Sequence, residues 1–417
     1  MTPTKTRKLA FCVGIGVSIA VVYLLFFCSK PVEVISQTNN ELFTYSSTKL
    51  SSATRKVPTV PTKEPTLFLP LTVKRTPENR KEIAIVVIIA NNKTIHEYVL
   101  PLATLRCYAQ AHGYLLLEIN LEREPEYVKA CPNKDFMFQR HCVMANLMKK
   151  SPEIEWFAFL DADIGVVNPN HLIEEFTHPA ADLIFYNRLY NYEITSGAYL
   201  AKNTEFARLF LGHWGSYEYK VKPGTLHGTD NGAISVTSAS QFASTVTFAG
   251  SLSRLLLCHL CSRATGGMHE NLAQLPLASN YDDLFRYESC ARGILGPAEW
   301  FRNGNGTIRQ LAHGRGYWSR DGWQTGSKWS DEDFMFHGWK ENKRNGEWKS
   351  MFTVEDFNPA LCKDPSTVHL SFAYKPAFHA DVAEIRKRLL KVGYKSYEEH
   401  LKRLQDIIHI QLKKAGI

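Results

Sequence analysis

The chain has 417 residues, enough for one large domain or two ordinary ones, and its 44% of hydrophobic and 12% of aromatic residues exclude wholesale disorder. The formal charge of +8 is mild for this length and favours anionic ligands such as nucleotide diphosphates without identifying one. The sequence has no zinc-finger, RNA-recognition or basic-zipper pattern, so we do not expect nucleic-acid binding.

The N-terminus is predicted to be a membrane anchor. Residues 9–28 form a run of twenty uncharged, mostly apolar residues, which as a helix reaches across roughly 30 Å of hydrocarbon. Basic residues precede this run and the two charges after it cancel, so the positive-inside rule places residues 1–8 in the cytosol and the rest in the lumen. The alternative is a cleaved signal peptide, whose apolar core is normally shorter and ends in small residues, unlike Phe26-Phe27-Cys28.

Residues 29–80 are predicted to be an extended stem, because they are rich in Ser, Thr and Pro and offer little to build a core. We expect one folded domain at 81–379 and a helical extension at 380–417. The extension has apolar residues at helical spacing with Lys and Arg between them. This pattern predicts a helix that packs on the domain, with a homodimer contact or a membrane-surface contact as alternatives.

Seven of the nine cysteines follow the stem, and an oxidising lumen allows them to form disulfides. Because seven is odd, at least one is free or pairs between chains. Cys258 and Cys261 are spaced like zinc ligands, but without a second pair a disulfide or plain burial explains them better. Glycosylation sequons occur at Asn92 and Asn305, and Asn92 follows a strand so closely that we expect it to be shielded.

The domain is predicted to alternate strands with helices. The β-branched run at 82–90 is typical of a strand buried on both faces of a parallel sheet, and Gly113 ends the helix that follows it. Such alternation indicates an α/β fold with ligands at the carboxyl ends of the strands. Strands are predicted at 82–90, 114–119, 156–160, 181–186 and 194–200, and helices at 95–112 and 136–150.

Two carboxylates one residue apart, Asp161 and Asp163, come directly after the apolar strand at 156–160. In an extended segment both side chains point to the same side, where they can hold Mn²⁺ or Mg²⁺ together with diphosphate oxygens. Unpartnered carboxylates at the end of a core strand are costly unless they are exposed or bind a metal. The alternative is an ordinary turn that leads to Asn168-Pro169.

The segment 155–169, Glu-Trp-Phe-Ala-Phe-Leu-Asp-Ala-Asp-Ile-Gly-Val-Val-Asn-Pro, resembles the central motif of GT-A glycosyltransferases. It is most similar to glycosyltransferase family thirty-four, which contains galactosyl- and xylosyltransferases, and more distantly to family eight. Residues 195–203, 229–234 and 334–340 resemble later motifs of these enzymes in the same order. The whole chain is similar to an animal family of type II membrane glycosyltransferases, with Gly-Arg-Gly-Tyr-Trp-Ser-Arg-Asp-Gly-Trp at 314–323 as its signature.

The resemblance implies a GT-A fold, a Rossmann-like mixed sheet flanked by helices, in an enzyme of the Golgi membrane. It also implies that His337 completes the metal site and that Lys340 meets the diphosphate. His227 and His313, each beside a glycine, compete with His337 for that role. Where family eight has Pro-Trp after the lysine, this chain has Glu341-Asn342.

The donor is expected to be a nucleotide-sugar, for example one that carries galactose, bound across the carboxyl edge of the first strands. Ala90 and Asn91 are the candidate contacts there. On the acceptor side Asp230 is the candidate catalytic carboxylate, which orients the nucleophile or stabilises positive charge, although Thr229-Asp230 also suits a helix N-cap. The acceptor is expected to be a glycan or glycoprotein, and the resemblance implies retention of the anomeric configuration.

Aromatic residues are dense between 317 and 339, where Trp rings could stack on sugar faces or pack in the core. The tryptophans concerned are Trp318, Trp323, Trp329 and Trp339. Nearby Arg315, Arg320 and Asp321 either contact sugar or phosphate or pair with one another. Two other classes of function share the predicted topology. One is a lumenal sugar-binding protein without turnover. The other is a sulfotransferase, which needs no metal but does need a glycine-rich phosphate loop, and this chain has Asn91-Asn92-Lys93 at that place instead.

Overall fold

The computed structural model describes residues 82–191, 193–221, 229–234, 284, 299–303, 306–311 and 318–414. The predicted cytosolic tail, membrane span and stem, 1–8, 9–28 and 29–80, lie outside these residues, so they stay predictions. Among the helices of the described part, none combines the length and the apolar character that crossing a bilayer requires.

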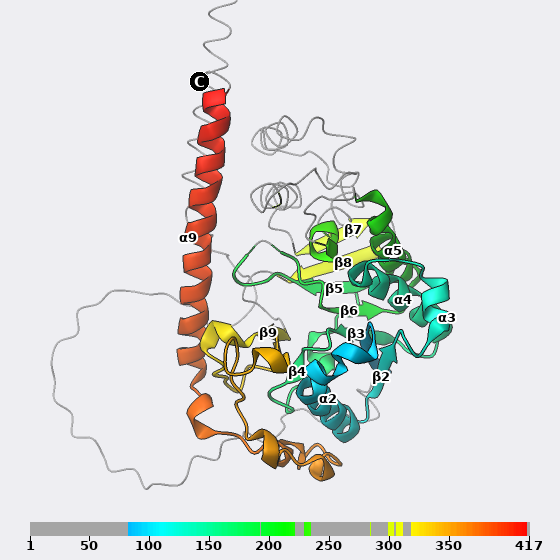
Figure 1. The fold of residues 1–417 in the computed structure, drawn as a ribbon, viewed down its shortest axis with the longest axis vertical. Helices are drawn as coiled ribbons and strands as arrows, with labels where there is room; N and C mark the ends of the chain where they lie inside the picture. Colours follow the sequence, from blue (N-terminus) through cyan, green and yellow to red (C-terminus); the bar gives the residue numbers. More distant parts are fainter. Residues whose placement is uncertain are drawn as a thin grey trace, which may run out of the picture. The chain divides into compact units, whose positions relative to one another are not determined.

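The core of the fold is a seven-stranded mixed sheet flanked by helices (Figure 1), which confirms the predicted α/β class. In the order β2-β1-β3-β6-β5-β8-β7, the first three strands are parallel, and β6 runs antiparallel to both of its neighbours. β5 and β8 pair in parallel, and β7 is antiparallel to β8. The strands are β1 (Ile83–Ile89), β2 (Leu115–Asn120), β3 (Trp156–Leu160), β5 (Leu183–Tyr186), β6 (Ala198–Lys202), β7 (Trp300–Asn303) and β8 (Gly306–Leu311).

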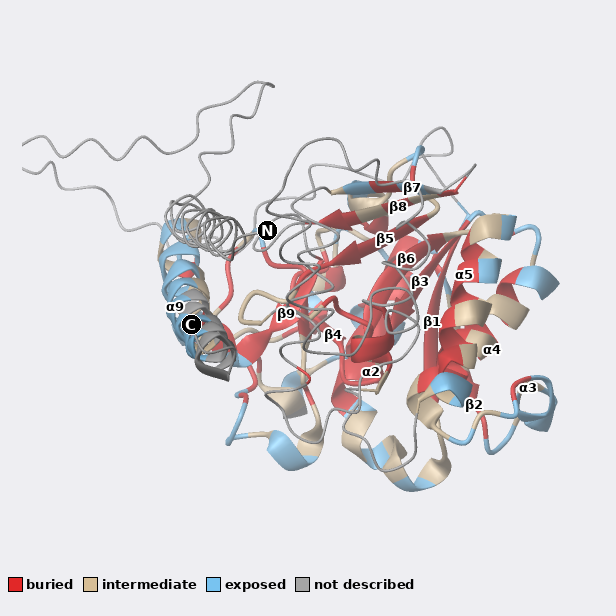
Figure 2. Cartoon of the chain, turned by 90° about the horizontal axis from the view of Figure 1, so that it is seen from above, coloured by how far each residue is buried: buried red, intermediate tan, exposed pale blue. Residues whose placement is uncertain are grey.

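Both faces of the sheet are buried at its centre, as the unbroken apolar sequence of β1 predicts. Alternate β1 residues pack into two separate cores, Ile85 and Val87 into one and Val86 and Ile88 into the other. The first core includes α2 and the smaller sheet, and the second includes α4 and α5. The central strands are accordingly buried along their length (Figure 2).

α-Helices and short 3-10 turns accompany the strands in the described part, where residues 229–234 are helical as well. The predicted helix at 136–150 is confirmed without change, and Gly113, with φ +69°, ends α2 as expected. The helices are α2 (Val99–His112), α3 (Pro125–Ala130), α4 (Phe136–Lys150), α5 (Glu205–Gly215) and α9 (Val382–Lys414). The 3-10 turns are η1 (Asn92–Tyr98), η2 (Ile173–Phe176), η3 (Ser216–Lys220), η4 (Gly322–Thr325), η5 (Glu341–Lys343), η6 (Val354–Asp356), η7 (Pro359–Leu361), η8 (Val368–Ser371) and η9 (Pro376–Phe378).

Two predicted starts are four residues too early, whereas the other predicted boundaries lie within two residues of those in the structure. The helix expected from Ile95 is α-helical only from Val99, because the Asn91 side chain accepts from the Lys93 backbone N–H and begins a tighter 3-10 turn. The strand expected from Ile194 joins the sheet only at Ala198. Ile194 forms an isolated bridge instead, and the backbone just before β6 bends toward the end of β3.

A second, three-stranded sheet lies beside the carboxyl end of β3. It consists of β4 (Gly165–Val166), β10 (Met335–His337) and β9 (Ser319–Asp321) in the order β4-β10-β9. β10 is antiparallel to β4 and parallel to β9. The pairing with β4 brings a late segment of the chain against the residues that directly follow the Asp161-Asp163 motif.

Two disulfides tie the described part together, and both were left open by the sequence. Cys107 on α2 is joined to Cys362, 255 residues later, and Cys131 is joined to Cys142 on α4. Cys258, Cys261 and Cys290 lie outside the described residues. The predicted C-terminal helix is confirmed as α9, which packs against η4.

Candidate functional site

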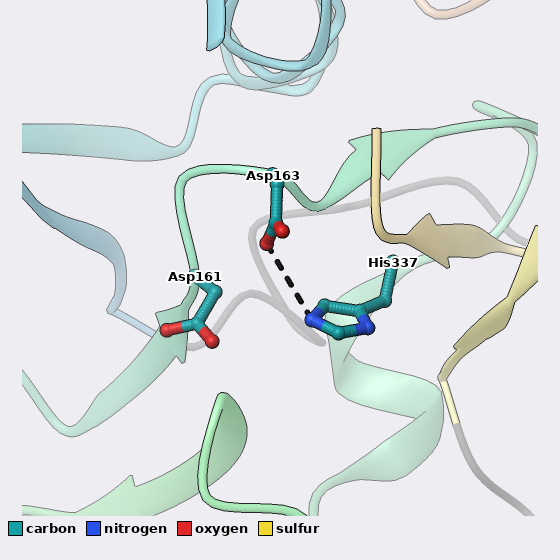
Figure 3. A group of neighbouring side chains, drawn as sticks. All are labelled: Asp161, Asp163 and His337. Atoms are coloured by element: carbon teal, nitrogen blue, oxygen red, sulfur yellow. Dashed lines mark ion pairs between the residues drawn. The ribbon is translucent and has the colours of Figure 1, made fainter. Parts of the chain in front are cut away.

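Three side chains meet where the two sheets adjoin. Asp161 directly follows β3, Asp163 lies in the turn that leads to β4, and His337 ends β10. Their ligand atoms all lie within 4.8 Å of one another, and His337 Nε2 is 3.5 Å from Asp163 Oδ1 (Figure 3). The structure thus brings together the three residues that were expected to bind a metal. The competitors His227 and His313 lie outside the described residues.

The donor set and its surroundings fit a divalent cation. Two carboxylates and a neutral imidazole match the ligand preferences of Mn²⁺, and the nitrogen donor favours Mn²⁺ over Mg²⁺. Gly197 leaves the space that Asp161 occupies, since a Cβ at this position would lie 2.8 Å from Asp161 Cγ and closer still to Oδ2. Asp161 is also fixed through its backbone, whose N–H donates to the Gly197 carbonyl at 2.7 Å.

His337 is oriented by a further carboxylate. Its Nδ1–H donates to Asp321 Oδ1 at 2.7 Å, which turns Nε2 toward Asp163. Burial by itself lowers the pKa of His337, but Asp163 and Asp321 outweigh it and raise the pKa to about 9. Burial opposes ionisation of Asp321, yet His337 and Arg188 hold the pKa of that carboxyl below its ordinary value. Without a cation, the two carboxylates therefore favour the protonated imidazole, and a metal ion bound at Nε2 would take the place of that proton.

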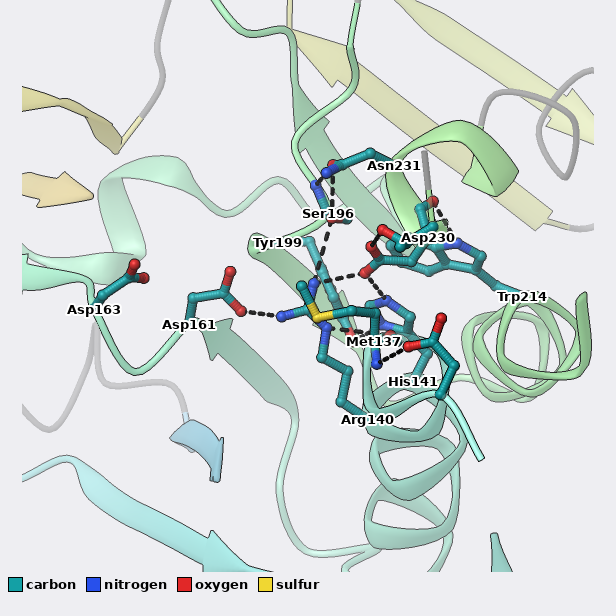
Figure 4. A network of polar contacts seen from close by, with 12 residues as sticks. Met137, Arg140, His141, Asp161, Asp163, Ser196, Tyr199, Trp214, Asp230 and Asn231 are labelled. Atoms are coloured by element: carbon teal, nitrogen blue, oxygen red, sulfur yellow. Dashed lines mark hydrogen bonds and ion pairs between the residues drawn. The ribbon is translucent and has the colours of Figure 1, made fainter. Parts of the chain in front are cut away.

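Behind Asp161 lies a buried polar network centred on Arg140 of α4 (Figure 4). The Arg140 guanidinium pairs with Asp161 through Nη1 and with Asp230 through Nη2, at 2.5 Å from Asp230 Oδ2. His141 Nε2 donates to the same oxygen at 2.8 Å. Ser196 Oγ, near Arg140, donates to Asn231 Oδ1 at 2.6 Å.

Asp230 is fully buried, with 0% of its surface exposed. Burial raises the pKa of its carboxyl, but Arg140 and His141 outweigh this and hold the pKa well below its ordinary value. Burial also raises the pKa of Asp161, and Arg140 only partly offsets it. The contacts of Asp230 in the described residues are internal ones, so its expected contact with an acceptor stays a prediction.

The candidate nucleotide contacts lie near the cluster in the fold but are less defined. Lys340 follows the turn at Gly338, whose φ of +89° favours glycine, and the Trp339 backbone N–H donates to the Asp163 carbonyl at 2.9 Å. Lys340 is partly exposed. Ala90 and Asn91 follow β1, the neighbour of β3, and the Asn91 side chain accepts from the Lys93 N–H at 2.9 Å.

A family match covers the metal cluster and the network behind it. The sequence profile of a family described as "Protein of unknown function, DUF273" matches residues 105–353. The chain belongs to this family. The matched region of this DUF273 member includes Arg140, both aspartates of the motif, Asp321 and His337. The cluster and its network are therefore part of the family's own domain.

Comparison with solved structures gives only distant likenesses. A glycosyltransferase involved in the glycosylation of the major capsid of PBCV-1 is 22% identical, with a TM-score of 0.27, over 34% of this chain and 69% of that one. A197 from STIV is 11% identical, with a TM-score of 0.22, over 36% of this chain and 74% of that one. TM-scores this low bear on neither fold nor function. No curated protein is similar enough to this chain to count as a match.

The tryptophans of the aromatic stretch at 317–339 of the DUF273 domain differ in burial. Trp318, Trp329 and Trp339 are buried and pack in the core, whereas Trp323 is 47% exposed. Arg320 does not pair with Asp321, because its guanidinium binds Asp333 with Nε 2.5 Å from Oδ1. Of the sequons, Asn92 accepts from Asn120 Nδ2 at 3.1 Å, and Asn305 lies outside the described residues.

Four residues that matter to the site were not assigned a place in it from the sequence. Arg140 could have been suspected as the arginine among the mostly apolar buried positions of α4. Gly197 and Tyr98 gave no such signal, and Asp321 was expected to contact sugar or phosphate or to pair with an arginine, because the actual roles depend on pairing across the chain. Burial raises the pKa of Tyr98, and so do the charges of the nearby Asp163 and Asp161, which places this ring beside the cluster.

Proposed function

We propose that this DUF273 protein is a metal-dependent glycosyltransferase of the GT-A type. It moves a sugar from a nucleotide-sugar to a hydroxyl group of a glycan or glycoprotein. The observation that carries the proposal is the convergence of Asp161, Asp163 and His337 within 4.8 Å at the carboxyl end of a central strand. Open α/β sheets bind their ligands at that edge.

The residues of the cluster and its surroundings have separate roles in this proposal. Asp161, Asp163 and His337 would hold Mn²⁺, which when bound supplies Lewis-acid stabilisation of the charge on the departing diphosphate. Asp321 keeps the imidazole turned toward the cluster, and Lys340 offers a point charge suited to phosphate oxygens.

In the transfer, the acceptor oxygen forms a bond to the anomeric carbon. The bond from that carbon to the diphosphate oxygen breaks, and its electron pair stays on the nucleoside diphosphate. The acceptor's proton leaves to the diphosphate or to solvent. The contacts of Asp230 support a positioning role, in which it holds Arg140 and through it Asp161.

We further propose that the enzyme works in the Golgi lumen, anchored by residues 9–28 and held off the membrane by the stem at 29–80. The length of the apolar run and the flanking charges support the anchor. The disulfides that join Cys107 to Cys362 and Cys131 to Cys142 suit an oxidising compartment.

The test is donor hydrolysis by the full-length protein, purified in mild detergent, over a panel of nucleotide-sugars with and without Mn²⁺. Asp163→Asn keeps the side-chain shape but removes a charged ligand, so we expect Mn²⁺-dependent release from one donor to fall by at least about 100-fold. Asp182→Asn is the matched control. The Asp182 side chain accepts from the N–H of Thr307 in β8, three places from β3 in the strand order, so this substitution removes a carboxylate charge outside the cluster. No release and no Mn²⁺-dependent nucleotide binding would favour a sugar-binding protein without turnover.

A further inference from the structure

Helix α9 packs on the domain with one stripe of its surface. Ile385 is buried, and Ser396 Oγ donates to the Tyr190 carbonyl. A Cβ at Gly393 would lie 3.3 Å from Leu189 Cδ1, so the helix backbone comes close to the domain there. Successive residues of an α-helix are turned by about 100°, which places these three helix positions on a stripe about 80° wide.

A second, apolar stripe of α9 lies to one side of that contact. Leu390 and Tyr394, one turn apart, are 68% and 66% exposed and lie roughly 130° around the helix from the centre of the domain-facing stripe. A run of large exposed apolar residues marks an interaction surface. The sequence continues the run at alternate spacings of three and four, the a and d pattern of a coiled coil. The positions of this apolar stripe are Leu390, Tyr394, Tyr397, Leu401, Leu404 and Ile408.

Two opposite charges flank the apolar stripe on the side away from the domain. With Leu390 at a d position, Lys391 and Glu398 both occupy e positions, and both are exposed. Lys395 pairs with Glu399 at 3.7 Å, whereas neither Lys391 nor Glu398 has an ion-pair partner in the part of the chain that the structure describes. The flank therefore carries a cation and an anion, one heptad apart, that a second helix can complement.

An antiparallel second copy of α9 matches both the apolar stripe and these charges. When Tyr394 faces the partner's Tyr397, Leu390 faces the partner's Leu401, and Lys391 comes beside the partner's Glu398. Two-fold symmetry forms each of these contacts twice.

Other pairings of the same helices bring like charges together. A shift by one heptad in either direction sets Glu398 or Lys391 beside its own copy, and a parallel pair sets Arg386 beside the partner's Lys391. Like charges across an interface oppose association. The charges therefore select the antiparallel register, in which residues 401–408 of each helix lie along residues 383–390 of the other.

We propose that the protein forms a homodimer through antiparallel pairing of α9 with α9 of a second copy. The mixed charges of the flank favour this occupant over an anionic lipid surface, which would favour lysines alone beside the apolar stripe. The inference goes beyond the proposed function and does not depend on it, because neither the metal cluster nor a nucleotide takes part in the contact.

The experiment is sedimentation velocity of the full-length protein in mild detergent, over a series of protein concentrations that yields the Kd of the dimer. We expect Leu390→Glu to raise this Kd at least about 100-fold, because it places a charge in the apolar seam twice. The same substitution should leave the melting temperature of the dilute monomer unchanged, since the side chain is 68% exposed.

Charge reversals test the register. Lys391→Glu and Glu398→Lys should each raise the Kd at least about fivefold, because each creates two like-charged pairs, and the two reversals combined should restore wild-type pairing. Lys402→Glu is the matched control, because this exposed lysine occupies an outer b position of the same helix.

A monomeric wild type would overturn the proposal, and so would a dimer whose Kd is unchanged in Leu390→Glu. A dimer that Leu390→Glu breaks but neither charge reversal weakens would overturn the antiparallel register. A monomer that loses binding to vesicles of phosphatidylserine and phosphatidylcholine in Leu390→Glu would assign the apolar stripe to a lipid surface instead. Dimerisation through α9 in a protein without donor hydrolysis would support this inference while the proposed function fails.

Discussion

Gly197 offers the most direct test of the metal site, because its missing side chain is what leaves room for Asp161. In Gly197→Ala the new Cβ would lie 2.8 Å from Asp161 Cγ. Carbon atoms in contact normally lie 3.5–4.0 Å apart, so the carboxyl group has to move by roughly 1 Å. Asp161 is short and paired with Arg140, so it has few ways to move without leaving its present place.

A shift of this size should disrupt metal binding without unfolding the domain. Metal–ligand distances in proteins hold to about ±0.2 Å, so a shift of roughly 1 Å takes Asp161 out of bonding range. Losses of 10–100-fold in metal affinity are typical even when only a supporting group is removed, which corresponds to about 1.4–2.7 kcal/mol. Overpacking by one methyl group costs about 1–3 kcal/mol of stability, which the domain should survive.

The assay is a calorimetric Mn²⁺ titration of the full-length protein, with the melting temperature measured on the same samples. Gly212→Ala is the matched control, because a Cβ there meets nothing closer than 3.9 Å and lies in helix α5. We expect Gly197→Ala to weaken Mn²⁺ binding at least tenfold and Gly212→Ala to leave it unchanged. A folded Gly197→Ala protein with wild-type Mn²⁺ affinity would refute the role of Asp161 as a ligand.

Three further predictions concern the network and the disulfides. Arg140→Met should cost about 3–5 kcal/mol in urea unfolding, because it leaves the buried Asp230 carboxylate without its guanidinium partner, and adding Asp230→Asn should recover part of this rather than add to it. Burial lowers the pKa of His141 to about 4 from an ordinary 6.5, so the unfolded chain takes up the proton first as the pH falls. Compared with His141→Gln, the wild type should therefore lose up to about 3 kcal/mol of unfolding free energy as the pH falls from about 6.5 to 4, and the difference between the two should be constant above about pH 6.5. A difference that is flat with pH over the whole range would contradict this. Cys362→Ser should lower unfolding free energy by about 2–5 kcal/mol under oxidising conditions, and no loss compared with wild type would mean that Cys107 and Cys362 are not joined in solution.

Local patterns were enough to predict most of the main sheet and its helices. The β1 run is apolar at every position because both faces of that strand are covered, and this is visible in the sequence without knowing its neighbours. Helix 136–150 and the stop at Gly113 likewise depend on residues close in sequence. The shift of the first helix start to Val99 came from one side chain, Asn91, that competes for a backbone N–H.

The site was predictable only as far as its ligands, and not in its support. Asp161 and Asp163 are marked by their place after an apolar strand, and His337 by resemblance alone. Arg188 and Gln324 line a small recess beside His337, whose walls come from segments more than 100 residues apart, and no short-range pattern encodes that meeting. The same holds for Asp321, whose partner follows 16 residues later on a parallel neighbouring strand.

The position of the cluster between two sheets has a consequence for stability. Asp161 belongs to the end of the large sheet, His337 belongs to the small one, and Asp163 lies on the segment that connects them. A cation held by all three would bind only when both sheets are in place, so it should stabilise the whole domain by mass action. At 100 times its dissociation constant, Mn²⁺ would add about 2.7 kcal/mol to the unfolding free energy. A gain in melting temperature that vanishes in Asp163→Asn would tie this stabilisation to the cluster, whereas an equal gain in that variant would locate the bound cation elsewhere.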